Sequence, residues 1–226
     1  MDQPIRINMA GPSGIGKTTV AKALSEMYGI TFISGSYSDL VPSTKDVPHS
    51  DMIQLDAKQI FEQDVQLLNA RNKTWGRYQN VISDRSYVDS AAYLIQKLSH
   101  RLPQCDMDDF IEKCKILNLI QTSHLIFFEF TRRYFSEWKM EDNGKRVLNK
   151  YYQEQISEIM KSVIMHHFGP PKYEGYIQGS EYSNLIYTLR GEYQDKEFVT
   201  SVLVLRELDH KARMRVISQF LSKTGL

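Results

Sequence analysis

The sequence predicts a three-layer α/β domain built on a five-stranded, mainly parallel sheet. Five short apolar runs alternate with longer segments of helical periodicity, an order that is typical of βαβ units. Each run is apolar on both faces, as expected of a parallel strand that helices cover on both sides. The connections are long enough for the crossover helices that parallel neighbours require. We therefore expect one domain over residues 1–226, with its ligand site beyond the carboxyl ends of the strands.

The individual elements follow from local composition. The predicted strands are rich in β-branched and aromatic residues and cover 6–10, 30–34, 80–83, 124–130 and 200–205. The predicted helices repeat apolar residues at spacings of three and four and cover 17–28, 56–71, 87–98, 107–120, 145–167 and 209–221. Residues 34–50 are rich in Ser, Gly and Pro and predict an ordered loop or binding segment. Residues 168–197 predict an irregular insertion or an extra strand pair.

Composition excludes several classes of protein. The chain of 226 residues carries 28 Lys and Arg against 27 Asp and Glu, so no global positive field marks a nucleic-acid binder. Its 2 cysteines exclude a disulfide scaffold and form no C-x-x-C pair for zinc. No apolar run approaches the roughly 20 residues of a membrane span. We expect a protein of the cytoplasm, or of the host cytoplasm if it is viral, with no membrane contact.

A phosphate-binding pattern, G-x-x-x-x-G-K-[ST], follows the first predicted strand directly. Glycines allow the backbone to turn successive N–H groups toward one anion, and the next helix directs its positive end to the same place. Lys17 is expected to contact the β- and γ-phosphates, and Thr18 to place its hydroxyl on Mg²⁺. The alternative is a Gly-rich turn without a ligand. The predicted ATP site comprises Gly11, Pro12, Ser13, Gly14, Ile15, Gly16, Lys17, Thr18 and Thr19.

This loop predicts a nucleoside triphosphate but not a reaction, since motors, GTPases and kinases share it. No N-K-x-D pattern follows a predicted strand, which disfavours a regulatory GTPase. The length disfavours an AAA+ module with a helical lid. A small-molecule kinase remains the best interpretation.

The third predicted strand runs into Asp84, Arg85 and Ser86. A carboxylate at this strand end would lie beside the phosphate loop, where Asp84 can hold Mg²⁺ or accept the proton of an attacking hydroxyl. Arg85 can bridge donor and acceptor and neutralise charge on the transferred group. The alternative is a helix start capped by Asp84 or Ser86, with Arg85 in a surface ion pair. The phosphate loop favours the functional interpretation.

A charged segment at about 131–147 follows the fourth predicted strand. Arginines that close over the phosphates contribute strongly to phosphoryl transfer, so this segment is a candidate lid. We choose Arg133 and Arg146 over Arg132 as its catalytic residues. The alternative is a solvated helix face, where mixed charges are ordinary.

Together these motifs resemble the thymidylate kinase and deoxynucleoside kinase branch of the P-loop kinases, over roughly residues 4–167 and the last strand–helix pair. Asp84-Arg85-Ser86 resembles the Asp-Arg-Tyr/His and Glu-Arg-Ser motifs of these two groups. The resemblance implies a P-loop kinase fold, an ATP donor, Mg²⁺ and a mobile Arg-bearing lid. The wording GPSGIGKTT, FISGS and DRSYVD also resembles a phage group that phosphorylates 5-hydroxymethyluracil in DNA during thymine hypermodification.

The loop after the second predicted strand departs from the thymidylate kinase pattern. Those enzymes carry an Arg-Glu-Pro segment there, whose Arg helps to hold the monophosphate of the acceptor. This chain reads FISGSYSD over 32–39 and has no Arg or Lys before Lys45. A neutral, hydroxyl-rich loop suits an acceptor hydroxyl better than a phosphate dianion. Asp39 becomes a second candidate for the general base.

The sequence therefore predicts an ATP-dependent kinase acting on a pyrimidine nucleotide hydroxyl, most specifically the hydroxymethyl group of 5-hydroxymethyluracil in DNA. One alternative is a deoxynucleoside or deoxynucleoside monophosphate kinase that acts on free precursors. Another is a P-loop ATP-binding regulatory module. DNA could contact a local segment at 73–78, where Trp75 or Tyr78 would stack on a base and Lys73 and Arg77 would bind phosphates. That segment is equally well a helix end with a capping aromatic. The sequence does not determine the oligomeric state, for which a dimer is an open alternative.

Overall fold

A seven-stranded mixed sheet forms the centre of the fold, in the strand order β2-β3-β1-β4-β7-β6-β5. The computed structural model describes residues 4–41, 56–131 and 149–226. Five strands are mutually parallel along β2-β3-β1-β4-β7. They are β1 (Arg6–Ala10), β2 (Thr31–Ile33), β3 (Val81–Ser83), β4 (His124–Phe128) and β7 (Lys196–Leu205). These match the five predicted strands and confirm the α/β class.

The strand count, however, is seven and not five. Residues 168–197 form regular structure: β5 (Lys172–Gln178) and β6 (Ser183–Tyr193) add an antiparallel pair at the β7 edge of the sheet. The same pairing lengthens β7, which begins at Lys196 because its first residues pair with the end of β6. Of the two interpretations of this stretch, the extra strand pair is the correct one.

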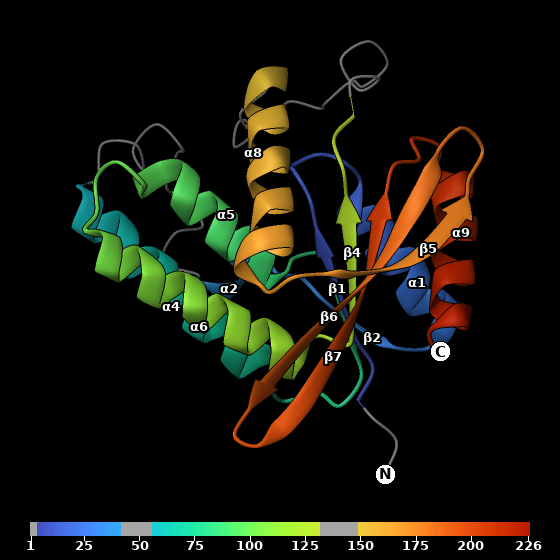
Figure 1. Ribbon diagram of the computed structural model, residues 1–226, viewed down its shortest axis with the longest axis horizontal. Helices are drawn as coiled ribbons and strands as arrows, with labels where there is room; N and C mark the ends of the chain where they lie inside the picture. The colour runs from blue at the N-terminus through green and yellow to red at the C-terminus, as the bar shows by residue number, and fades with distance from the viewer. Residues whose placement is uncertain (1–3, 42–55, 132–148) are drawn as a thin grey trace.

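Helices cover both faces of the sheet, which gives the predicted three layers (Figure 1). One face packs against α4 (Ala57–Trp75), α5 (Tyr87–Leu98), α6 (Gln104–Gln121) and α8 (Lys150–Ser162), which continues as a π-helical turn (Val163–His167). The other face packs against α1 (Lys17–Tyr28) and α9 (His210–Lys223). Neighbouring residues of β4 divide between the two cores, Phe127 facing the first and Phe128 the second. This alternation is why the strand reads as continuously apolar.

Helix ends follow the local capping chemistry. Helices α1 and α5 begin and end at the predicted residues. Ser86 caps α5 and the Asp89 carboxylate accepts the backbone N–H of Ser86, which forms a capping box. Helix α8 begins after Asn149, so the first residues of the predicted 145–167 helix fall outside the described ranges. None of the helices described is long and apolar enough to cross a membrane.

Candidate functional site

The phosphate loop joins β1 to α1 at the carboxyl edge of the sheet. Gly11, Gly14 and Gly16 all have positive φ, which a side chain would disfavour. A Cβ at Gly11 would also lie 2.9 Å from the Cβ of Phe128 in the neighbouring strand. Gly16 occupies the N-cap of α1 without a side-chain cap, and the first turn of the helix holds no acidic residue. The helix therefore directs its N–H groups and its positive end toward the loop, where an anion can bind.

Lys17 is buried at the base of this loop, with 5% of its surface exposed. Its ammonium group donates to the carbonyl oxygens of Gly11 and Pro12, the second at 2.7 Å. The charge is thereby held among the backbone groups that would surround a triphosphate. This is where the sequence motif predicts the lysine.

Thr18 and Asp84 meet beside the loop. Thr18 Oγ1 donates to Asp84 Oδ2 at 2.6 Å, although the two residues lie 66 positions apart in the sequence. Hydroxyl and carboxylate oxygens are the ligands that Mg²⁺ prefers, and the ion usually completes its shell with water and substrate phosphates. Among the described residues, no group of three or more His, Cys, Asp or Glu side chains could hold a metal alone. The pair therefore fits an Mg²⁺ ion that is shared with a nucleotide.

Asp84 is 6% exposed and is also held from its other side. Its Oδ1 accepts the backbone N–H of Gly35 at 2.9 Å, from the loop that follows β2. The carbonyl of the same Gly35 accepts from Arg71 Nη2 at 3.0 Å. The loop after β2 and the end of β3 are thus joined through one glycine. A Cβ on Gly35 would lie 2.4 Å from the Cβ of Arg85, so the close approach of this loop to Arg85 requires glycine.

Ser86 and Arg85 make the contacts that the alternative interpretation predicts, and the role of Arg85 in phosphoryl transfer stays a prediction. Ser86 caps α5, and Arg85 Nη1 pairs with Asp89 at 3.2 Å on the first turn of that helix. The Asp89 carboxylate is buried, whereas about a quarter of the Arg85 side chain remains exposed (24%). Burial acts to lower the pKa of Arg85, but Tyr93, Asp89 and Asp84 raise it above its ordinary value. Arg85 is therefore a permanently charged side chain next to Asp84.

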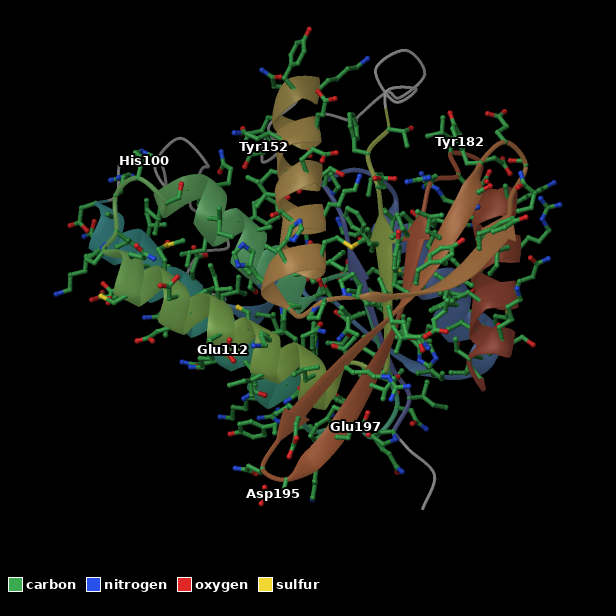
Figure 2. All side chains as sticks on the ribbon, in the orientation of Figure 1. His100, Glu112, Tyr152, Tyr182, Asp195 and Glu197 are labelled. Atoms are coloured by element: carbon green, nitrogen blue, oxygen red, sulfur yellow. The ribbon has the colours of Figure 1, made fainter. Side chains whose placement is uncertain are left out.

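An aromatic side of the site was missed in the sequence. The Tyr93 hydroxyl lies 3.2 Å from the Oγ of Ser13 in the phosphate loop. One turn further along α5, Gln96 accepts from the Tyr152 hydroxyl of α8 at 3.5 Å, and Figure 2 shows Tyr152 on this helix. Asp89 and Tyr93 stand four residues apart and so share a face of α5, while Arg85 precedes the helix and pairs with Asp89. That spacing is the signal that could have identified Tyr93.

Asp39 lies on the short helix α2 (Tyr37–Leu40) and is exposed. Its Oδ2 accepts from the hydroxyl of Ser34 at 2.5 Å. The carboxylate is thus oriented by its own loop. Its role as a competing general base stays a prediction.

The lid residues cannot be compared with the structure. Arg132, Arg133 and Arg146 lie outside the described residues, as does most of the predicted lid at 131–147. Their catalytic roles also stay predictions.

The proposed stacking role of Trp75 is wrong. Its side chain is fully buried, and its ring packs edge-on against Tyr87 with centroids 5.0 Å apart. Residues 76–80 are exposed, but they precede β3 and so lie at the amino end of a strand whose carboxyl end carries Asp84. The segment at 73–78 thus contains the end of α4, as the alternative interpretation held, and a contact of Tyr78, Lys73 or Arg77 with DNA stays a prediction.

One further arginine reaches the phosphate loop from the end of the chain. Arg213 of α9 donates from Nη1 to the carbonyl of Ile15 at 2.8 Å and from Nε to the carbonyl of Glu207 at 2.7 Å. Its guanidinium carbon lies 5.4 Å from the ring centroid of Phe128. Because Arg213 stands 198 residues from Ile15, no local pattern could have indicated this contact.

Solved structures share this arrangement of elements. A deoxyadenosine kinase from M. mycoides with bound dATP matches with a TM-score of 0.58 and 16% identity, covering 96% of this chain and 99% of that chain. A second structure of this kinase, with bound dCTP, matches with a TM-score of 0.60 and 14% identity, covering 97% and 100%. At such low identity the likeness concerns the fold. No curated protein matches the sequence significantly.

A family model described as an AAA domain matches residues 6–164. The match includes the phosphate loop, Asp84 and the helices from α1 to α8. The residues that follow it form β5, β6, β7 and α9, so they do not make the helical lid of an AAA+ module. Because the match spans well over half of its length, the chain belongs to this AAA domain family.

Proposed function

We propose that this protein is an ATP-dependent kinase that transfers the γ-phosphate of ATP to a hydroxyl group of a nucleoside or nucleotide. The observation that carries the proposal is the contact between Thr18 and Asp84, beside the uncapped N-terminus of α1. A fold shared with deoxyadenosine kinases over nearly the whole chain supports it. Those structures hold dATP, dCTP, or the products dCMP and dCDP.

The residues of the site divide between binding and stabilisation. Lys17 and the N–H groups at the start of α1 bind the triphosphate. Thr18 and Asp84 would hold Mg²⁺, which when bound offsets the charge of the β- and γ-phosphates. Arg85 stabilises the transferred group, because it is charged and stands next to Asp84. The lid arginines Arg133 and Arg146 complete the proposed set.

The transfer needs little covalent chemistry from the protein. The acceptor oxygen forms a bond to the γ-phosphorus while the bond between that phosphorus and the bridging oxygen of ADP breaks. The hydroxyl proton passes to a carboxylate, for which Asp84 is the first candidate and Asp39 the second. Both oxygens of Asp84 already accept hydrogen bonds, so its orientation is fixed before a substrate arrives.

The acceptor group is better described as an alcohol than as a phosphate. The loop after β2 contains no Lys or Arg between Ser34 and Val41. Arg71 reaches this loop from α4, but it is buried and its Nη1 and Nη2 groups donate to Gly35, Ser86 and Ser90. Within its described residues, 34–41, this loop therefore offers no cation of its own to a second phosphate dianion. This disfavours a deoxynucleoside monophosphate kinase.

Two alcohols remain as acceptors. The sequence motifs favour the hydroxymethyl group of 5-hydroxymethyluracil in DNA, as in phage thymine hypermodification. The shared fold favours the hydroxyl of a free deoxynucleoside. The burial of Trp75 leaves Tyr78 as the residue of the segment 73–78 that could stack on a base, at the amino end of β3 and away from Asp84. A regulatory ATP-binding module, with no acceptor, is the third hypothesis.

The test offers several acceptors in parallel. The full chain is incubated with γ-labelled ATP and Mg²⁺ together with deoxynucleosides, their monophosphates, plain DNA or DNA containing 5-hydroxymethyluracil. We expect label in an alcohol acceptor and none in plain DNA, with activity abolished in Lys17→Ala. Label confined to a free nucleoside would eliminate the DNA acceptor, and label confined to the modified DNA would eliminate the free one. ATP hydrolysis without any labelled acceptor would leave the regulatory module.

A further inference from the structure

Two buried arginines outside the sequence motifs end on the backbones of the two loops that form the proposed site. Arg213 of α9 is 7% exposed, and Arg71 of α4 is 2% exposed. Both donate to backbone carbonyl oxygens, Arg213 to Ile15 and Glu207 and Arg71 to Gly35 and Ser86. Burying a guanidinium group is costly unless hydrogen bonds hold it, so these contacts with the two loops are what the burial of each arginine depends on.

Arg213 holds the backbone of the phosphate loop through a hydrogen bond to a carbonyl oxygen. Its two carbonyl acceptors are Ile15 within the loop and Glu207 after β7, so one side chain joins these segments. A Cβ at Gly16 would lie 2.9 Å from Nη1, which shows how closely the guanidinium follows the loop. The planar group is fixed over the Phe128 ring and can hold both carbonyls at defined angles. The loop shape around Ile15 and Gly16 therefore depends on Arg213.

Arg71 supports Asp84 through one intermediate. It donates to the carbonyl of Gly35, and the N–H of the same residue donates to Asp84 Oδ1. It also donates to the carbonyl oxygen of Ser86 and to the hydroxyl oxygen of Ser90, at the start of α5. The other oxygen of Asp84 accepts from Thr18. A connected path thus runs from the buried arginine to the pair that fits Mg²⁺.

We propose that Arg213 and Arg71 are positioning residues, Arg213 for the triphosphate-binding shape of the loop and Arg71 for the placement of Asp84 beside Thr18. The proposal rests on the ATP site of the proposed function and is independent of the acceptor.

A matched control exists at the opposite edge of the sheet. Arg6 also donates to two backbone carbonyls, those of Tyr78 and Ile120, but it lies at the amino end of β1. Arg6→Lys removes the same kind of contact without approaching the site. It separates a general loss of stability from a specific loss of positioning.

The experiment measures the dissociation constant of ATP by calorimetry, once with Mg²⁺ and once with EDTA, on the full chain. Arg213→Lys should weaken ATP binding about tenfold under both conditions, because a charged hydrogen bond that shapes the loop is lost. Arg71→Lys should leave the EDTA value within about twofold and reduce the Mg²⁺-dependent gain about tenfold. Arg6→Lys should change neither value. Thermal unfolding of each variant verifies that it is folded.

A second variant keeps the Arg71 half testable if Arg71→Lys does not fold. Gly35→Ala should also lose the Mg²⁺-dependent gain, because its methyl group would displace the loop from Arg85 and Asp84. Equal effects of all three lysine variants would overturn the proposal, as would an Arg71→Lys variant that weakens binding equally with and without Mg²⁺. A wild-type chain that binds no ATP would overturn both proposals. A wild-type chain that binds ATP but phosphorylates no acceptor would refute the proposed kinase activity and leave the positioning proposal standing.

Discussion

Asp84 accepts hydrogen bonds from two distant parts of the chain, Thr18 on α1 and Gly35 after β2. A carboxylate held on both sides has lost its freedom to rotate before substrate binds, and such preorganisation is what phosphoryl transfer requires from a protein. Asp39 is exposed and is oriented by a neighbouring serine of its own loop. Replacing Asp84 should therefore lower the rate of phosphoryl transfer more than replacing Asp39.

Asp84→Asn should lower kcat by about 10²–10³-fold, because the variant loses a negative charge and an oxygen ligand at once. Asp39→Asn should lower kcat by less than about tenfold, the loss expected if it only assists the acceptor. Steady-state kinetics with the best acceptor of the labelling assay would measure both. The reverse order of effects would make Asp39 the general base and leave Asp84 with the metal alone.

Single residues also show where sequence reasoning stops. The sequence identified the candidate site residues that stand at a fixed offset from a strand end, namely Lys17, Thr18, Asp84 and Arg85. The sequence could not identify Arg71 and Arg213, because each reaches a partner that is distant in the sequence. Such a contact produces no periodic pattern of residues. Trp75 was misread for the opposite reason: its basic neighbours suggested a nucleic-acid contact, while tertiary packing placed the ring in the core.

Elements were predictable where local chemistry sets their ends. Helix α1 begins at a positive-φ glycine and ends at another, Gly29, and helix α5 begins at a capping box. The extension of β7 toward Lys196 was not predictable, because its exposed first residues are stabilised by pairing with β6. The two residues that join these strands, Gln194 and Asp195, lack the glycine that usually marks such a hairpin in a sequence.

His124, at the start of β4, joins that strand to the end of α9. Its ring lies between the hydroxyls of Ser123 and Thr224, at 2.9 and 3.0 Å, and packs edge-on against Phe220. Burial lowers the pKa of His124 to about 4. The folded chain therefore binds this proton less readily than the unfolded chain, whose histidine titrates near its ordinary value of about 6.5.

The free energy of unfolding should fall as the pH drops below about 6.5, since protonation then favours the unfolded chain, and the loss should continue to about pH 4. Between pH 7.5 and pH 5 this one group should contribute a loss of about 2 kcal/mol. His124→Gln should flatten that part of the profile. Urea unfolding at the two pH values would measure it, and an unchanged slope in the variant would contradict the assignment.

At the scale of the whole molecule, the order β2-β3-β1-β4 brings the phosphate loop, Asp84 and the start of the predicted lid to one edge of the sheet. The carboxyl ends of parallel strands meet at that edge. Ligand binding there contacts the phosphate loop, α1 and the end of β3 at the same time. It should therefore stabilise the entire fold.

ATP with Mg²⁺ at 100 times its dissociation constant should add about 2.7 kcal/mol to the free energy of unfolding. For a chain of this size the corresponding rise in Tm is about 5–10 °C. Lys17→Ala should show almost no rise at the same ATP concentration. Differential scanning calorimetry would test this, and an equal shift in the variant would place the nucleotide elsewhere.

The added strands β5 and β6 lie on the far side of β7 from the phosphate loop. Figure 2 shows Asp195 at the tip of the β6–β7 hairpin, beyond the amino end of β4 and far from the carboxyl edge. Gln194 and Asp195 both have positive φ there, as a tight two-residue turn requires. This tip of the hairpin therefore lies away from the phosphate loop and Asp84. For a protein engineer, that turn is a place to attach a label or insert a peptide while the chemistry is left alone.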